Sequence, residues 1–233
     1  MKTVIFYGAS GHAEGWRDCL RTFNDPINVM AYVDDFRGDD QLSIADAPIL
    51  TFEAARARFP DVPYVITVGA PSDRRRIAAK VRRAGGAFCS LYESTGWISP
   101  NIRVGEGSMI APTPTYVGPR STIGEHTMIM ALCTVAHDCA LGDYVTVCPG
   151  VNVSGYVRIE DDAFIGTGAT IVNGTATNPL RIGRGAIVCA GAVVMQSVQD
   201  GAKVAGNPAT DMRSVVAGRS RVRRARNLRN DSA

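Results

Sequence analysis

An aliphatic side chain recurs at every sixth position through the centre of this chain. Ten successive positions at this spacing, from Val117 to Ile171, hold Val, Ile or Leu. A period of six fits neither an α-helix nor a flat strand, whose side chains repeat every 3.6 and every 2 residues. It fits a solenoid of triangular cross-section, in which each face takes one hexapeptide and points one apolar side chain inward.

The same spacing continues on both sides of this central series. Three hexapeptides make one coil, so residues 98–199 supply about five coils. The period does not determine the handedness of the coil. The flanking inward positions are Ile98, Val104 and Ile110, one residue out of phase, and Ile182, Val188 and Val194, which follow an insertion at 173–181.

The first ninety residues follow a different pattern, in which strand and helix signals alternate. Strands that alternate with helices imply a parallel sheet with helices on its faces. We therefore predict a Rossmann-like α/β domain at 1–92, a β-helix at 93–210 and a tail at 211–233. The expected strands are 2–8, 28–35, 64–69 and 87–92, and the expected helices lie within 9–23, 51–59 (N-cap Thr51) and 71–85 (a Ser or Asp cap and a glycine stop).

The charges of the chain are unevenly distributed. The formal net charge is only +3, which does not suggest a protein that binds nucleic acid. Residues 211–233 hold seven Arg and two Asp, so the tail is basic and the remainder is mildly acidic. We expect a solvated tail, with a contact to cofactor phosphates or to a partner as the alternative.

The pattern of the six cysteines indicates the redox environment in which the protein works. They form no C-x-x-C pair, and no signal peptide or long apolar segment is evident. This combination favours free thiols in a reducing cytoplasm and predicts no membrane insertion. Cys and His are not clustered at metal-ligand spacing, so we expect no metal site.

Four short segments resemble the sugar acetyltransferases that modify bacillosamine precursors and sialic acid. They are YGASGH (7–12), VDDFRG (33–38), AHDCALGD (136–143) and GNPA (206–209). The resemblance implies a left-handed β-helix, a homotrimer with active sites between subunits, and acetyl-CoA as cosubstrate. It also implies acetylation of the amino group of a nucleotide-linked amino sugar.

The segment VAHDCAL (135–141) holds the candidate catalytic residues. Val135 and Leu141 are successive inward positions, so His137 lies on the outer surface of the solenoid. Acetyl transfer needs a base, and an imidazole exchanges protons near neutral pH. Asp138 can orient the ring and stabilise its charged form. The plain alternative is a surface histidine beside a solvated Asp.

Further roles are implied by the resemblance. Gly155 lies three hexapeptides after His137, one coil away on the same face, and its amide is expected to stabilise the oxyanion. Thr167, Ala190 and Gly191 are expected to line the coenzyme groove, although small residues also permit tight corners. The family often has a second histidine nine positions after the first, where this chain has Thr146. Thr146 is therefore also expected to bind the coenzyme, through a hydroxyl that can bond a carbonyl but carries no charge.

The resemblance also implies a nucleotide pocket in the first domain. The segment GASGH lacks the G-x-G-x-x-G spacing, which disfavours NAD, but its glycines allow a turn into a helix N-terminus that can receive a phosphate. Asp34 and Asp35 are candidates to accept hydrogen bonds from a ribose or base, and Arg37 is a candidate partner of a diphosphate. Gly11, His12 and Gly69 complete the expected substrate-binding set.

The residues leave other functions open. A sugar O-acetyltransferase would use the same base. A zinc hydratase on the same solenoid would need three histidine ligands, and the repeats contain only His126 and His137. A non-catalytic trimeric scaffold that binds a sugar nucleotide is the third alternative. We expect His126 to be a solvated loop residue.

Overall fold

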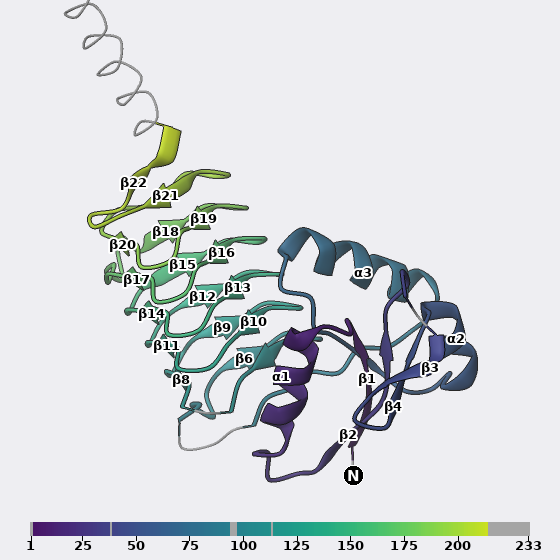
Figure 1. Cartoon of the computed structure of the whole chain (residues 1–233). Helices are drawn as coiled ribbons and strands as arrows, with labels where there is room; N and C mark the ends of the chain where they lie inside the picture. The colour runs from purple at the N-terminus through teal and green to yellow at the C-terminus, as the bar shows by residue number, and fades with distance from the viewer. Residues whose placement is uncertain (1, 38, 94–96, 113, 214–233) are drawn as a thin grey trace, which may run out of the picture.

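The chain folds into an α/β domain that lies beside a column of stacked coils (Figure 1). The computed structural model describes residues 2–37, 39–93, 97–112 and 114–213. The predicted tail at 211–233 therefore lies outside the described residues from position 214 onward. No helix in the described part of the chain is long and apolar enough to cross a membrane.

The α/β domain is built on a five-stranded sheet with the order β3-β4-β2-β1-β5. The predicted parallel sheet is confirmed for β1, β2, β4 and β5. The β3–β4 hairpin was not predicted, because the segment DDQLSIADAPIL (39–50) has no sustained apolar run before its last residues. The strands are β1 (Lys2–Tyr7), β2 (Ile27–Val33), β3 (Asp39–Ile44), β4 (Ala47–Leu50) and β5 (Tyr64–Ile66).

The three helices lie where the sequence predicts them: α1 (Gly11–Leu20), α2 (Phe52–Arg58) and α3 (Pro71–Arg83). Thr51 caps α2 as expected, since its hydroxyl accepts a hydrogen bond from the Ala54 N–H at 3.3 Å. The expected Ser or Asp cap of α3 is wrong. Ala70 is the N-cap, because Pro71 takes the first helical position, where its missing N–H leaves no bond unmade.

The fourth predicted strand, 87–92, joins the two domains instead of extending the sheet as a full strand. It forms only isolated bridges, from Phe88 to Tyr64 of β5 and from Leu91 to Met109. Met109 belongs to the first strands of the coil column. The chain therefore passes from one sheet to the next through a hydrogen-bonded connection.

The coil column is a left-handed parallel β-helix with three flat sheets. Thr134 pairs with Asn152 and Asn152 with Thr170, so one coil takes 18 residues, as three hexapeptides predict. We call the sheets B, C and D.

Sheet B contains β7 (Met109–Ile110), β10 (Met128–Ile129), β13 (Thr146–Val147), β16 (Phe164–Ile165), β19 (Ile187–Val188), β21 (Lys203–Ala205) and β22 (Thr210–Asp211). Sheet C contains β8 (Tyr116–Val117), β11 (Thr134–Val135), β14 (Asn152–Val153), β17 (Thr170–Ile171) and β20 (Val193–Val194). Sheet D contains β6 (Arg103–Val104), β9 (Thr122–Ile123), β12 (Ala140–Leu141), β15 (Val157–Ile159) and β18 (Leu180–Ile182).

The predicted inward positions form the core of the column. None of the ten residues from Val117 to Ile171 is more than 3% exposed, and together they belong to one continuous cluster. Burial of each such side chain contributes roughly 1.5–3 kcal/mol. Val104 is an exception among the flanking positions, since it is only partly buried at the first coil. The last coil is closed by β21 and β22 around the GNPA turn.

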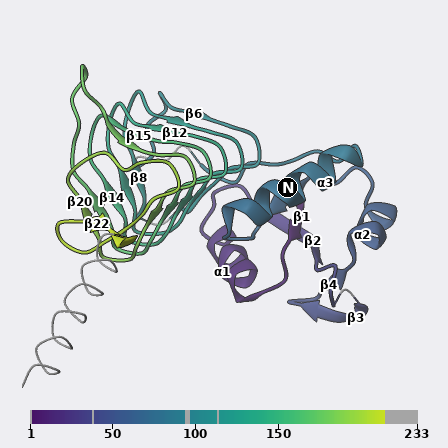
Figure 2. The same ribbon diagram turned by 90° about the horizontal axis from the view of Figure 1, so that it is seen from above.

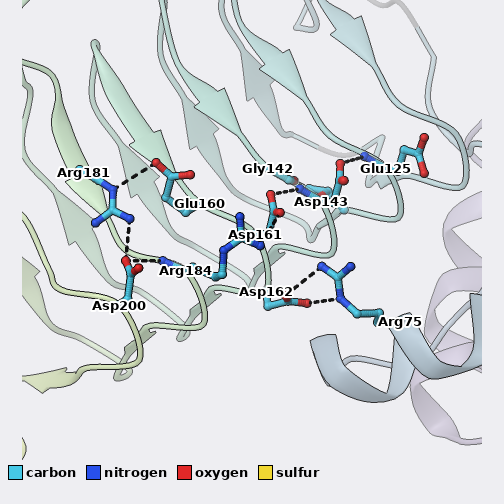
Figure 3. A network of polar contacts seen from close by, with 11 residues as sticks. Arg75, Glu125, Gly142, Asp143, Glu160, Asp161, Asp162, Arg181, Arg184 and Asp200 are labelled. Atoms are coloured by element: carbon cyan, nitrogen blue, oxygen red, sulfur yellow. Dashed lines mark hydrogen bonds and ion pairs between the residues drawn. The ribbon is translucent and has the colours of Figure 1, made fainter.

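Aspartates tie consecutive coils together along the edge between sheets D and B (Figure 3). Asp143 accepts a hydrogen bond from the Glu125 N–H, and Asp161 accepts one from the Asp143 N–H, at 2.8 and 3.0 Å. The glycine before Asp143 is required, because a Cβ on Gly142 would lie 2.3 Å from an Asp161 oxygen. Asp143 and Asp161, which lie 18 residues apart, are thus structural links between consecutive coils.

Helix α3 holds the two domains together. The Arg74 side chain is 1% exposed and donates to the carbonyls of Val68 and Gly69 in its own domain. The same guanidinium donates to the carbonyls of His126, Tyr144 and Val145 in the β-helix, at 2.7–3.1 Å. Burial lowers the pKa of Arg74 to about 10, so it is still charged at neutral pH. On the surface, Arg75 forms a two-bonded ion pair with Asp162 (Figure 3).

Candidate active site

His137 lies at the corner between sheets C and D, on the segment that joins β11 to β12. Its side chain is 49% exposed, so the predicted outward position is confirmed. Its Nδ1 lies 2.7 Å from Asp138 Oδ2. A carboxylate can only accept, so Nδ1 carries the proton of this bond and Nε2 is the ring nitrogen left for a substrate. Figure 2 shows this edge of the column directed away from the α/β domain.

Asp138 is held by a second partner that the sequence analysis missed. Arg120 lies one coil earlier and donates two hydrogen bonds to this carboxylate, from Nε and Nη2, both at 2.7 Å. The bonds from Arg120 and then from His137 lower the pKa of Asp138 to about 2. The 18-residue spacing between Arg120 and Asp138 is the signal that reveals this pair, since residues one coil apart are neighbours.

Gly155 lies directly against the imidazole. A Cβ at this position would be 2.8 Å from His137 Cε1 and 3.0 Å from Nε2, so only glycine leaves room for the ring. The next residue, Tyr156, meets the ring edge-on with centroids 5.3 Å apart. Gly155 is buried, and no residue in the described chain accepts a hydrogen bond from its N–H. An N–H without an internal acceptor can donate to an acceptor of a ligand.

The expected coenzyme residues do not lie at the His137 corner. Thr167 follows β16 and is exposed, and the exposed Ala190 and Gly191 follow β19, one coil further along. These residues form a column at the corner between sheets B and C. Sheet C therefore separates this column from His137 within one chain.

The expectation that Thr146 binds the coenzyme does not fit its position in this chain. Its side chain is fully buried at the junction between the domains. Its hydroxyl donates to the Gly69 carbonyl at 2.7 Å and accepts from Arg74 at 3.0 Å. The six-residue register carries no information about the α/β domain that covers this face of sheet B.

A cavity of about 470 Å³ opens at the carboxyl ends of β1 and β2. The predicted Asp34 and Asp35 line it, together with the turn Gly8–Ser10. Ligands commonly bind at this edge of a parallel sheet. Asp34 accepts from Arg37 Nε at 2.8 Å, so Arg37 is paired next to the cavity, and Arg37 also donates to the Ala9 carbonyl.

Asp35 is bound on three sides. It accepts from Lys80 Nζ at 2.6 Å, from the Tyr7 hydroxyl and from the Phe52 N–H. Partial burial alone would raise the pKa of Asp35, but these bonds, led by Lys80, outweigh it and lower the pKa. The carboxylate is thus negative and held in place at the cavity wall.

Three cations of α3 also line this cavity, and the sequence analysis missed them. They are Arg76, Lys80 and Arg83. The segment RRRIAAKVRR (74–83) spreads its charges around the helix, and its two sides have different functions. Arg74, Arg75 and Arg82 contact the β-helix, whereas the other three cations face the cavity.

The remaining predicted substrate residues lie outside the cavity wall. Gly11 is the first residue of α1. His12 and Gly69 are neighbours, since a Cβ on Gly69 would lie 3.8 Å from the His12 ring. His12 Nε2 accepts from Trp16 Nε1 at 3.1 Å, and burial lowers the pKa of His12. The Gly69 carbonyl is bonded at the junction by Arg74 and Thr146, so neither residue presents a free group to the cavity.

The expectation that His126 is a solvated loop residue is wrong. It is 1% exposed, with its ring stacked on Tyr144 at 5.1 Å and edge-on to Phe88 at 4.5 Å. Burial, reinforced by Arg82, Arg74 and Arg75, lowers the pKa of His126 to about 3. It is therefore a neutral packing residue. The described residues contain no group of three or more His, Cys, Asp or Glu side chains placed to hold a metal ion.

Two family models match one segment in each of the two domains. Residues 3–81 match the PglD N-terminal domain, and residues 120–155 match the bacterial transferase hexapeptide (six repeats). The GDP-perosamine N-acetyltransferase of Escherichia coli O157:H7 is 32% identical over 220 residues, which cover 89% of this chain and 96% of that protein.

Solved structures resemble the whole described fold. One is a histidine mutant of perosamine N-acetyltransferase from Caulobacter crescentus in complex with CoA and GDP-perosamine, with 26% identity and a TM-score of 0.78 over 91% of this chain and 96% of that chain. Another is the acetyltransferase domain of PglB from Neisseria gonorrhoeae FA1090 in complex with acetyl coenzyme A, with 28% identity and a TM-score of 0.76 over 91% and 99%.

Proposed function

The chain belongs to the family of hexapeptide-repeat N-acetyltransferases that act on nucleotide-linked amino sugars, and on this premise we propose its reaction and the residues that perform it. It transfers the acetyl group of acetyl-CoA to the amino group of a nucleotide-linked amino sugar. His137 is the general base. The observation that carries this assignment is the exposed imidazole, bonded through Nδ1 to Asp138 and packed against Gly155, whose N–H has no acceptor among the described residues.

Each of these groups has one task in the reaction. Nε2 of His137 takes the proton from the amine as the amine nitrogen attacks the thioester carbon. Asp138 stays ionised, holds the ring and stabilises the imidazolium that forms. Gly155 N–H donates to the oxyanion of the tetrahedral intermediate. When the C–S bond breaks, the imidazolium returns a proton to the thiolate, and CoA leaves as the free thiol.

Two or more copies of the chain complete the site, and we propose a homotrimer. His137 lies at the corner between sheets C and D, and the coenzyme column of Thr167, Ala190 and Gly191 lies at the corner between sheets B and C. A neighbouring protomer that packs alongside would bring its own column next to His137. This arrangement would form the coenzyme groove between subunits.

The cavity of the α/β domain is the proposed nucleotide site. Its three cations suit a diphosphate, and its carboxylates suit the hydroxyl and N–H donors of a ribose and base. The relatives named above include enzymes of GDP-perosamine, which makes a GDP-linked amino sugar the first acceptor to test. We place the reaction in the cytoplasm, in keeping with the six unpaired thiols of the described chain.

The experiment is a coupled measurement of thiol release and product mass. Purified protein is incubated with acetyl-CoA and a panel of GDP- and UDP-linked sugars that carry either an amine or only hydroxyls at the variable carbon. We expect CoA release with an amino sugar and a product heavier by one acetyl group, stable to mild hydroxylamine because it is an amide. Acetylation of the hydroxy sugars instead would establish an O-acetyltransferase, and binding without turnover would establish a scaffold.

A further inference from the structure

The hexapeptide spacing is interrupted once between the strands of the later coils. Six residues separate each pair of inward positions from Val117 to Ile171, whereas eleven separate Ile171 from Ile182. Five residues are therefore inserted between β17 and β18. In Figure 2 a green loop extends beyond the outline of the stacked coils, near the labels β15 and β20. We call residues 173–179 the corner loop.

The corner loop is attached to the two residues that touch the candidate base. Its first end is fixed by the Gly174 N–H, which donates to the Gly155 carbonyl at 3.0 Å, and its second by the Leu180 N–H, which donates to the Tyr156 carbonyl at 3.1 Å. Gly155 and Tyr156 are the residues against which the His137 ring lies. The two ends of the loop are thus anchored to the residues that pack against the candidate base.

The base of the loop is too tightly packed for any residue larger than glycine at position 174. A Cβ on Gly174 would lie 2.4 Å from the Tyr156 carbonyl oxygen and 2.3 Å from the Leu180 nitrogen. Above this base, Thr175 and Asn178 close a tight turn through mutual backbone bonds of 3.0 and 3.2 Å and a bond from the Asn178 N–H to the Thr175 hydroxyl at 3.0 Å. The loop therefore has a defined shape before any ligand binds.

The level of the loop along the column favours the coenzyme over the sugar. The loop belongs to the coil of β16, β17 and β18, the same coil as Thr167 and the one before Ala190. The contacts that α3 makes with the β-helix run from Glu106 to Asp162, which precedes this coil. The loop accordingly lies beyond His137 on the side away from the α/β domain that holds the nucleotide cavity.

The side chains of the loop suit one part of the coenzyme. The sequence NGTATNP (173–179) contains hydroxyls and amides but no charged group, and Thr175 to Asn178 are exposed. It has no cation for the phosphates of CoA or of a sugar nucleotide. The pantetheine arm carries two amides and a hydroxyl and no charge, and such groups pair with neutral donors and acceptors.

We propose that the corner loop is a wall of the coenzyme groove that hydrogen-bonds the pantetheine arm of acetyl-CoA and so holds the thioester beside His137. This inference rests on the proposed function. The residues offered to the ligand are Thr177 and Asn178, which are exposed and belong to the turn. Thr177 has one weak partner, Thr175 at 3.4 Å, which a ligand can replace.

The test removes the insertion and compares two ligands. Deletion of 175–179 restores the six-residue spacing from Ile171 to Ile182, so the coil can close as the earlier coils do. We expect the Kd for CoA, measured by calorimetry, to rise about tenfold, as for two lost hydrogen bonds. The Kd for adenosine 3′,5′-bisphosphate, which lacks the pantetheine arm, should change less than twofold.

A full-length variant keeps the proposal testable if the deletion does not fold. Thr177→Ala combined with Asn178→Ala leaves the backbone bonds of the turn in place and removes the two proposed hydrogen bonds, so we again expect a rise of about tenfold in the Kd for CoA alone. An unchanged CoA affinity, an equal loss for the bisphosphate, or a rise only in the KM of the sugar would overturn the proposal. Failure of the wild type to acetylate any nucleotide amino sugar would refute the proposed function instead.

Discussion

The two histidines of the β-helix occupy similar corners and have opposite surroundings. His126 and His137 both lie on segments that join consecutive strands, two or three positions after a buried aliphatic residue. His126 is 1% exposed and His137 has a side chain that is 49% exposed. The difference comes from the α/β domain, which covers the corner between sheets D and B and leaves the corner between sheets C and D open (Figure 2).

This contrast shows what a repeat can and cannot encode. The hexapeptide register decides whether a side chain points into or out of its own coil. It does not decide whether an outward side chain meets water, another domain or a ligand. His126 meets Tyr144 and Phe88 and is a packing residue, whereas His137 meets Asp138 and Gly155 and has the geometry of a base.

The largest expected effect separates the two histidines by activity. His137→Ala should lower kcat about a thousandfold, because general-base catalysis contributes between a hundredfold and ten-thousandfold. The thermal midpoint should hardly change, since the side chain is exposed. His126→Phe is the matched control and should retain kcat within a few-fold. Steady-state assays of thiol release decide the matter, and equal losses in both variants would remove His137 from the mechanism.

The second-largest expected effect is on stability and concerns the junction with the α/β domain that covers His126. Arg74→Met leaves several buried carbonyls of the junction without a donor, and we expect a loss of about 3 kcal/mol or more in the free energy of unfolding. Arg74→Lys should recover part of this loss, because it keeps the charge but offers fewer donors. Urea titrations of the three proteins measure the effect. A stable Arg74→Met variant would show that the domains are held by surface pairs such as Arg75–Asp162.

A pH titration distinguishes the buried histidine from a solvated one. The pKa of His126 is lowered from 6.5 to about 3, so between these values the unfolded chain binds a proton that the folded chain does not. The stabilisation is complete above pH 6.5 and is lost as the pH falls. At pH 5 the loss from this group is about 2 kcal/mol.

His126→Phe removes this dependence. The difference in free energy of unfolding between pH 7.5 and pH 5 should therefore be smaller in the variant by about 2 kcal/mol. Urea titrations at the two pH values provide the measurement. Because each protein is compared with itself, any constant cost of placing Phe at this corner cancels. An identical pH dependence in both proteins would mean that His126 is protonated in the folded state.

The sequence predicted most of what depends on a single coil or a single element. The buried series from Val117 to Ile171, the three helices and the outward position of His137 all follow from local periodicity or capping. It failed where one part of the chain meets another. Thr146 and His126 were misplaced because α3 covers them, and the cations of the cavity were missed because a helix run does not reveal which side faces a site.

The smallest effect tests the one partner that periodicity could have revealed. Arg120 fixes both oxygens of Asp138, and its removal lets the pKa of Asp138 move back toward 3.8. The carboxyl stays ionised at any ordinary assay pH, so the loss is one of orientation, and we expect Arg120→Gln to lower kcat about tenfold with little change in KM.

Arg158→Gln is the control for Arg120→Gln, because it removes the same charge from an exposed side chain of sheet D that has no ion-pair partner among the described residues. Arg120→Lys should give an intermediate kcat, since an ammonium cannot form both bonds at once. If Arg120→Gln and Arg158→Gln have the same kcat as the wild type, Asp138 is positioned by His137 and its own backbone alone. The geometry at the exposed corner of His137 would then depend on a single coil, whereas the geometry at the covered corner of His126 depends on the α/β domain.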